Sequence, residues 1–210
     1  MMRPVVGARG LVTVSRQLQG KAVPVSKAQP KYRVAIIGGG SAGVSVAGQL
    51  LRKLPKAMHS QIAVIEPKDT HLYQPYWTMV GGLGLDVKNS ARPMAKMVPL
   101  GVEWIKERCE SFDPASNSIT LASGARVEYD VLVVAAGLQQ NFKVVPGLWE
   151  TMGKNGVSSI YSYDFSPKVW ENVQATRKGK AIFTNPATAV NCGGAPQKIA
   201  YLAESAWRSS

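Results

Sequence analysis

A run of glycines near the start of the chain has the spacing of a phosphate-binding turn. Residues 38–43 read Gly-Gly-Gly-Ser-Ala-Gly, which follows the pattern G-x-G-x-x-G. In such a turn the first glycine permits a sharp bend, the second lets the backbone approach a pyrophosphate, and the third allows a helix to pack closely on a strand. Backbone N–H groups at the start of that helix would face the phosphates. The residues expected to bind a dinucleotide here are Gly38, Gly40, Ser41, Ala42 and Gly43.

A carboxylate follows the glycine run at the distance that dinucleotide-binding units require. Glu66 lies 23 residues after Gly43, at the end of the apolar run 62–65. A carboxylate in this position accepts hydrogen bonds from a ribose diol and repels a 2′-phosphate. The sequence therefore favours FAD or NAD over NADP as the cofactor.

A second segment favours FAD over NAD. Residues 129–137 read Tyr-Asp-Val-Leu-Val-Val-Ala-Ala-Gly, an acidic start followed by a buried strand and a turn of small residues. This segment resembles the second FAD fingerprint of flavoproteins with two dinucleotide-binding domains, although Ala stands where Thr is more usual. The strands expected just before it resemble the β insertion of the same enzymes. We therefore expect FAD to be the cofactor.

Cys192 is the candidate catalytic residue. It lies in the segment Asn-Cys-Gly-Gly-Ala-Pro-Gln at 191–197, immediately before a predicted helix. A helix N-terminus favours the thiolate form of a cysteine, and Lys198 adds positive charge. Residues 185–194 lack a second G-x-G-x-x-G, so a thiol stands where a nicotinamide site would otherwise be built. We interpret Cys192 as a nucleophile, and the alternative is an inert buried cysteine.

Three further residues follow from their place in the predicted fold. Gln74 comes shortly after Glu66, so it is expected at the carboxyl edge of the sheet, within hydrogen-bonding reach of a flavin or its linker. Nearby His71 is interpreted as a surface or packing residue. Cys109 is expected to end the strand at 102–108, to be buried for structural reasons, and to contact a cofactor only through its backbone.

Hydrophobic periodicity predicts the elements that must position these residues. Helices are expected from the glycine run to about Leu54, at 167–177 and at 195–207. Strands are expected at 32–37, 62–65, 102–108, 118–121, 126–129, 131–135 and 181–184. Residues 68–99 have no regular pattern, and a long excursion of this kind is usually functional.

The predicted fold class is α/β. Residues 31–150 are expected to form a Rossmann-type FAD-binding domain with a small antiparallel β insertion. Residues 155–210 are expected to begin a second Rossmann-like domain. One strand and one helix cannot bury each other's apolar faces, so the rest of this domain is expected to be absent from the chain. The chain is therefore interpreted as a fragment or a truncated gene model.

Charge is concentrated at the N-terminus. The net charge is +12, yet residues 1–65 contain ten Lys or Arg and no Asp or Glu, which leaves fifteen basic and thirteen acidic residues in the rest. Residues 1–30 have the composition of a mitochondrial presequence, and the alternative is a disordered basic tail. The charge distribution argues against nucleic-acid binding. Two cysteines 83 positions apart support neither a disulfide scaffold nor a zinc cluster, and no metal site is expected.

Beyond these single features, the chain resembles the N-terminal half of the mitochondrial sulfide:quinone oxidoreductases. The segments that carry the resemblance are GGGSAG at 38–43, AVIEP at 63–67, HLYQPYWTMVG at 71–81, ARPMAKMVPLGVEWIK at 91–106 and AIFTNPATAVNCGGAPQKIAYLAE at 181–204. The last of these is the most specific, because it separates this family from the type II NADH dehydrogenases.

The resemblance implies a function and a set of roles. Ser41, Ala42, Glu66, Gln74 and the backbone of Cys109 correspond to FAD contacts, and Cys192 corresponds to one of two redox cysteines. In the family, hydrogen sulfide is oxidised at that pair, the sulfane sulfur passes to an acceptor such as glutathione, and electrons pass through FAD to ubiquinone. The resemblance places the second cysteine and the helices that reach the inner mitochondrial membrane in the C-terminal half.

Two other functions stay open at this point. A related NADH:quinone oxidoreductase would have its flavin reduced by NADH instead of sulfide. A non-catalytic FAD-binding fragment would hold the flavin and react with neither compound.

Overall fold

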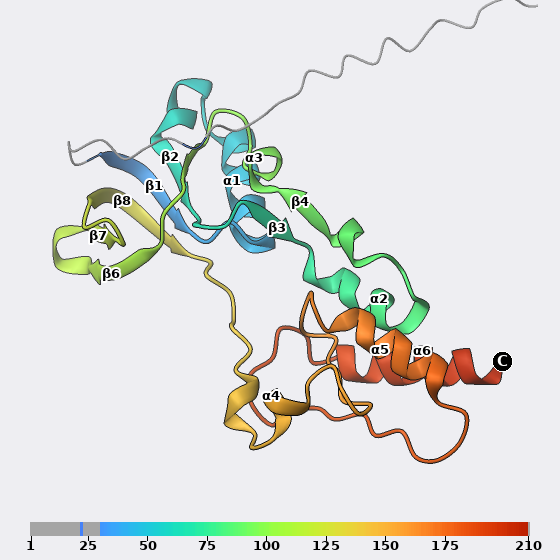
Figure 1. Ribbon diagram of the computed structural model, residues 1–210. Coiled ribbons are helices and arrows are strands. Elements are labelled where there is room, and N and C mark those ends of the chain that lie inside the picture. Colours follow the sequence, from blue (N-terminus) through green and yellow to red (C-terminus); the bar gives the residue numbers. More distant parts are fainter. Residues whose placement is uncertain (1–21, 23–29, 210) are drawn as a thin grey trace, which may run out of the picture.

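The computed structural model describes residue 22 and residues 30–209, so the predicted presequence lies almost entirely outside the described residues. A six-stranded sheet and a group of helices lie at opposite ends of the molecule in Figure 1. The helices are α1 (Ser41–Lys53), α2 (Trp77–Leu83), α3 (Met94–Met97), α4 (Leu148–Thr151), α5 (Ser166–Ala175) and α6 (Ala195–Arg208). The strands are β1 (Lys31–Ile37), β2 (Ile62–Ile65), β3 (Thr70–Leu72), β4 (Ala91–Pro93), β5 (Glu103–Ile105), β6 (Cys109–Asp113), β7 (Ser118–Leu121) and β8 (Arg126–Val134).

The larger sheet is mixed, with β1 at its centre. Its strand order is β5-β2-β1-β8-β7-β6. Strand β1 pairs in parallel with β2 and β8, β2 pairs in parallel with β5, and β6, β7 and β8 form an antiparallel meander. The predicted α/β class, with a Rossmann-type sheet and a small antiparallel insertion, is confirmed.

Apolar side chains of β1 enter two cores because successive residues of a strand point to opposite faces. Ile36 packs with Ala47 of α1 and Val64 of β2, and α1 covers this face. Ile37 packs instead with residues of the meander, including Ile119. A strand buried on both faces must be apolar throughout its buried length, as β1 is over residues 34–37.

The meander differs from the prediction in two respects. The strand expected at 102–108 is limited to β5, and Cys109 begins β6, where the sequence analysis placed it at the end of the preceding strand. The two strands expected at 126–129 and 131–135 are one strand, β8, because β1 offers a continuous partner from Lys31 to Ile37. Asp130, which separates the two apolar runs, stays in β8 and forms an ion pair with Lys31 at 2.9 Å.

Residues 68–99, which have no regular sequence pattern, form a two-stranded antiparallel sheet of β3 and β4 together with α2. Figure 1 shows these elements leading from the large sheet to α5 and α6. Glycines let α2 pack closely on those two helices. A Cβ at Gly81 would lie 3.0 Å from Val169 Cβ of α5, and a Cβ at Gly82 would lie 2.6 Å from Leu202 Cβ of α6.

The predicted helices at 167–177 and 195–207 are confirmed as α5 and α6, but the predicted strand at 181–184 is not formed. Its residues are irregular, and Ile182 is 83% exposed. A strand needs a hydrogen-bonding neighbour, and no strand of the described residues pairs with this segment. The proposed division into domains at 31–150 and 155–210 stays a prediction.

One edge of β8 is open. Strand β7 pairs with β8 only from Arg126 to Glu128, and no strand among residues 30–209 pairs with that edge farther along. Val131 and Val134 are 53% and 62% exposed there. None of the helices in the described part of the chain has the length and apolar character that crossing a bilayer requires.

The packing of α1 on the glycine turn gives a stability prediction. A Cβ at Gly43 would overlap the carbonyl oxygen of Gly38, whereas a Cβ at Gly48, on the same helix, meets no described atom within 4 Å. Gly43→Ala is expected to destabilise the fold by about 3 kcal/mol because the backbone must shift. Gly48→Ala is expected to stabilise it by about 0.5–1 kcal/mol through helix propensity. Urea unfolding of both variants measures the difference, and equal midpoints would contradict this account of the turn.

Candidate functional site

The glycine turn lies where the carboxyl ends of the central strands meet. The backbone N–H of Gly38 donates to the carbonyl of Ile65 at 2.9 Å, which joins the turn to the end of β2. The N–H of Ala135, just after β8, donates to the carbonyl of Ile37 at 2.8 Å. Ligands of open α/β sheets bind at such carboxyl ends. The turn is thus held between the ends of three neighbouring strands.

At each predicted glycine of the turn, the surroundings give a different steric reason for the lack of a side chain. Gly38 has φ of +102°, and a Cβ there would lie 2.8 Å from the carbonyl carbon of Ala135. Gly43 is buried against Gly38, as described above. Gly40 is exposed, and a Cβ there would meet no atom of the described chain within 4 Å. The space above Gly40 is therefore free for a ligand to approach the backbone.

The N-terminus of α1 opens onto this space. Gly40 is its N-cap residue and has no side chain that could accept from the first N–H groups, and no acidic residue lies in the first turn. The side chains of Ser41 and Ala42 are exposed. The first N–H groups of a helix lack intrahelical acceptors and carry the positive end of the helix dipole. The residues present therefore fit the pyrophosphate of a dinucleotide.

Glu66 lies beside the turn, with its carboxylate held by two backbone donors. Its Oε2 accepts from the N–H of Gly39 and its Oε1 from the N–H of Lys68, both at 2.9 Å. An ionised carboxylate can accept about four hydrogen bonds, so capacity is left for a diol. The Trp104 indole N–H donates to the Glu66 carbonyl at 2.9 Å and fixes the backbone. Glu66 is thus oriented before any ligand binds.

His71 is a buried packing residue, and its exposed fraction is 4%. The prediction left open a surface or a packing position, and the structure assigns the second. Its Nδ1 lies 3.0 Å from the carbonyl oxygen of Gly39. The two peptide units that flank Gly39 are therefore both held: its N–H donates to Glu66, and its carbonyl oxygen contacts His71.

Gln74 and the Cys192 loop lie together. We define the Cys192 loop as residues 185–194, which precede α6. The Nδ2 of Asn191 donates to Oε1 of Gln74, and Nε2 of Gln140 donates to Oδ1 of Asn191 at 3.2 Å. Gln74 begins a short 3₁₀ turn, Gln74–Tyr76, directly before α2. Residues 117 and 51 positions apart are joined here through three side-chain amides.

Cys192 is exposed, as a thiol that meets a small solute must be. Its carbonyl oxygen accepts two hydrogen bonds, from the Tyr161 hydroxyl at 2.6 Å and from the backbone N–H of Ala195 at 3.2 Å. The second bond belongs to the turn that starts α6. Burial raises the pKa of the Tyr161 phenol, and the negative charge of Cys192 as a thiolate raises it further. Tyr161 therefore stays a donor at neutral pH while the thiol side of Cys192 is left open.

Cys109 begins β6, opposite Leu121 in the β6–β7 pair, and packs against the core that includes Ile37 and Ile65. It is half-buried, and its thiol donates to the carbonyl of Ser111 at 3.6 Å. Burial raises the pKa of this thiol, and the nearby Glu110 carboxylate raises it further, against the smaller opposing effect of the Ser111 bond. A raised pKa keeps the neutral form, so this cysteine is a poor nucleophile at neutral pH.

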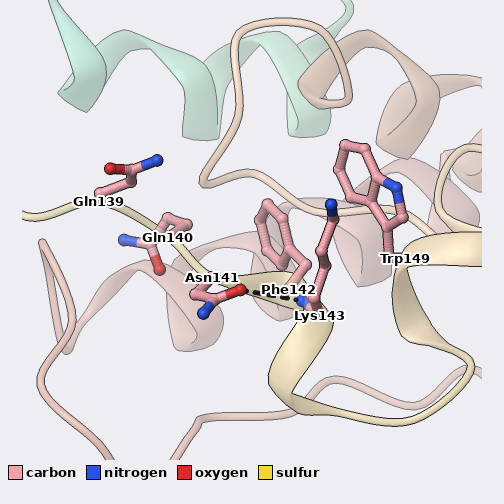
Figure 2. Close-up of a pocket in the computed structure, with 6 residues that line it drawn as sticks. All are labelled: Gln139, Gln140, Asn141, Phe142, Lys143 and Trp149. Carbon is pink, nitrogen blue, oxygen red and sulfur yellow. Dashed lines mark hydrogen bonds between the residues drawn. The ribbon is translucent and has the colours of Figure 1, made fainter.

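A pocket of about 640 Å³ adjoins the Cys192 loop, in the segment after β8. Figure 2 shows the residues that line it, which are Gln139, Gln140, Asn141, Phe142, Lys143 and Trp149. The Lys143 ammonium lies 5.7 Å from the Trp149 ring centroid, a cation–π distance. One lining residue, Gln140, also donates a hydrogen bond to Asn191 of the Cys192 loop.

The predicted site residues fall into two groups, and no side-chain hydrogen bond among residues 30–209 joins Cys109 to either of them. Gly38, Gly40, Ser41, Ala42, Gly43 and Glu66 share the sheet edge, Gln74 and Cys192 are joined through Asn191, and Cys109 lies on the meander. Tyr161, Gln140 and Asn191 were not among the predicted site residues. No sequence signal distinguishes Tyr161, whereas Gln140 follows the small-residue turn after β8, which predicts proximity to the same edge.

The comparisons with known proteins agree with this geometry. Residues 32–181 match the family described as pyridine nucleotide-disulphide oxidoreductase. The mitochondrial sulfide:quinone oxidoreductase of Dictyostelium discoideum is 40% identical over 91% of this chain and 42% of its own length. The protein of that name from Mus musculus is 36% identical over 87% of this chain and 40% of its own length.

A solved structure agrees with these relatives. The crystal structure of the sulfide:quinone oxidoreductase from Aquifex aeolicus superimposes with a TM-score of 0.53 at 26% identity, over 69% of this chain and 32% of that one. The chain spans about two fifths of the length of the two mitochondrial relatives it matches. The chain therefore belongs to the pyridine nucleotide-disulphide oxidoreductase family and is a homologue of the sulfide:quinone oxidoreductases.

Proposed function

We propose that this chain supplies the FAD site and one redox cysteine of a mitochondrial sulfide:quinone oxidoreductase. The observation that carries the proposal is the contact between Asn191, beside the exposed Cys192, and Gln74, which follows the dinucleotide-binding unit. A thiol is brought beside the cofactor domain at a place where the sequence has no second glycine-rich turn. The similarity to enzymes named for sulfide and quinone supports the same assignment.

Each part of the proposed FAD site has a separate task. The N–H groups of Ser41 and Ala42 would bind the pyrophosphate, Gly38 and Gly40 would allow the close approach, and Gly43 would hold α1 in place. Glu66 would accept from the ribose hydroxyls. Gln74 would donate its free amide N–H to the flavin or its linker, and Cys109 would contribute only backbone atoms. When bound, FAD supplies a two-electron acceptor.

Cys192 would carry the sulfur chemistry. Its thiol and one hydrosulfide ion would form a sulfur–sulfur bond, giving a persulfide, one proton and two electrons, which the cofactor and then ubiquinone accept. Attack on the outer sulfur by a thiol such as glutathione would regenerate the Cys192 thiol and carry the sulfane sulfur away. The exposure of Cys192 suits both small reactants.

The remaining parts of the reaction are assigned to the part of the relatives outside the match. In this proposal the first reduction of the flavin by sulfide needs Cys192 alone. The second redox cysteine, the quinone site and the contact with the inner membrane surface, which complete the catalytic cycle, belong to that part. Mitochondrial localisation follows from the same similarity. The predicted presequence at 1–30 is consistent with it.

Sulfide-dependent reduction of bound flavin tests the function directly. The chain is loaded with FAD, and the visible absorbance of oxidised flavin is followed after addition of sulfide. Wild type and Cys109→Ser are expected to lose this absorbance, and Cys192→Ser is expected to keep it because no persulfide can form. Bleaching of Cys192→Ser at the wild-type rate would overturn the role of Cys192. A flavin that NADH bleaches and sulfide does not would overturn the assignment of substrate.

Substitution of Glu66 tests the FAD site. Glu66→Gln keeps an oxygen that can accept from Gly39 but loses the charge that strengthens hydrogen bonds to a diol. Such charged bonds contribute about 1.5–3 kcal/mol, so the dissociation constant for FAD is expected to rise at least roughly tenfold in a fluorescence titration. Glu103→Gln is the matched control, because Glu103 accepts from Tyr32 near the opposite end of β1. Equal losses in both variants would contradict a specific role for Glu66.

The two thiols should differ in their reaction with iodoacetamide. Because the folded-state pKa of Cys109 is raised, its thiolate fraction and alkylation rate should increase only at a higher pH than for an unperturbed cysteine. In urea the same residue should titrate at its ordinary pKa, at lower pH than in the folded chain. Peptide mass spectrometry across a pH series measures both, and Cys192 is expected to be labelled first near neutrality. Faster labelling of Cys109 in the folded chain than in urea would contradict this.

A further inference from the structure

Three side-chain amides form a directed chain beside Cys192. Gln140 donates to the Asn191 oxygen, and the Asn191 nitrogen donates to the Gln74 oxygen. The Asn191 amide thus serves as acceptor on one side and donor on the other. Gln74 keeps both N–H groups of its amide, and Gln140 keeps its oxygen, so each end of the chain still has a group for a further partner.

The Cys192 loop has little else to hold it. Residues 181–189 are all exposed, and the ring contact of this segment, Phe183 with Trp207 of α6 at 6.3 Å between centroids, lies several residues before Cys192. Gly193 and Gly194 follow the cysteine, and a Cβ at either would meet no described atom within 4 Å. A segment with few buried contacts opens at low free-energy cost unless specific hydrogen bonds hold it. The amide chain and the Tyr161 hydroxyl are such bonds.

The two sets of bonds act on different parts of the loop. Tyr161 and the N–H of Ala195 hold the carbonyl of Cys192 and join it to the start of α6. Asn191 joins the preceding residue to the dinucleotide-binding part of the chain, through Gln74 and Gln140. Only the second set crosses from the loop to residues that follow Glu66 and β8. It therefore sets where the thiol lies relative to the cofactor site.

We propose that Gln74, Asn191 and Gln140 form an amide latch that positions Cys192 against the flavin site. Asn191 is the central positioning residue, and Gln74 has two roles, since it holds the loop through its oxygen and faces the cofactor through its nitrogen. The positioning role of the latch in sulfur chemistry rests on the proposed function. Its role as a physical link between distant segments of the chain is independent of that function.

Hydrogen exchange tests the link without any flavin chemistry. In the full chain without FAD, Gln74→Met is expected to accelerate amide exchange of peptides covering 187–194 roughly fivefold, the effect of losing one hydrogen bond. Asn191→Ala removes the bonds with both Gln74 and Gln140, so a larger acceleration is expected. The double variant is expected to exchange no faster than Asn191→Ala alone, because that change already breaks the bond that Gln74→Met removes. Gln74→Glu is expected to restore protection, since a carboxylate still accepts from Asn191. Asn141→Ala is the matched control. The Asn141 side chain is a nearby amide that accepts from the backbone N–H of Lys143 and is not part of the latch.

The outcomes separate the two proposals. Unchanged exchange in both single variants, or fully additive effects, would overturn the latch. If the latch positions the thiol, Asn191→Ala in the FAD-loaded chain should lower the maximal rate of sulfide bleaching about tenfold or more, with FAD affinity and melting temperature unchanged. If Asn191→Ala accelerates exchange but the flavin is still bleached at the wild-type maximal rate, the latch is a structural link and its positioning role is overturned. Absence of bleaching in wild type would overturn the proposed function and leave the exchange result to decide the link.

Discussion

The approach of α1 to the turn after β1 is the contact on which the site depends. The carbonyl oxygen of Gly38 occupies the space that any side chain at residue 43 would need, so the helix begins directly on the strand end. This closeness places the first N–H groups of α1 beside the ends of β2 and β8. It also brings the Gly39 peptide within reach of Glu66 on one side and His71 on the other. The proposed dinucleotide site therefore depends on backbone packing, and Glu66 and His71 support it through their contacts with Gly39.

A second close approach connects this site to the thiol. Helix α2 packs on α5 and α6 through glycines whose Cβ positions are crowded by Val169 of α5 and Leu202 of α6. Gln74 lies just before α2, and Cys192 lies just before α6, so the docking of one helix on the other brings the two short segments together. The glycines of α2 thus act at a distance, because they determine how near the thiol can come to the cofactor domain.

Local patterns predict much of the fold, and the failures have a common physical origin. The unit from β1 to β2, the glycine turn and α6 follow from periodicity and turn chemistry over a few residues. Helix α2 could not be found this way, because Gly81 and Gly82 disfavour a helix and only packing against distant residues stabilises it. The apolar run at 181–184 has the composition of a strand but no described neighbour to pair with. The position of Cys192 before a helix was predictable, whereas its link to Gln74 joins residues far apart in sequence and was not.

The open edge of β8 has a consequence for handling the protein. The N–H of Tyr129 still donates to the Asn117 carbonyl, but beyond it no described strand pairs with the outer edge of β8, beside two exposed valines. Such an edge is a template on which another extended segment can add, and a second molecule offers the same edge. Association through this edge would be an encounter between two molecules, so its extent would increase with protein concentration. A peptide that pairs with the free part of the strand would compete with it.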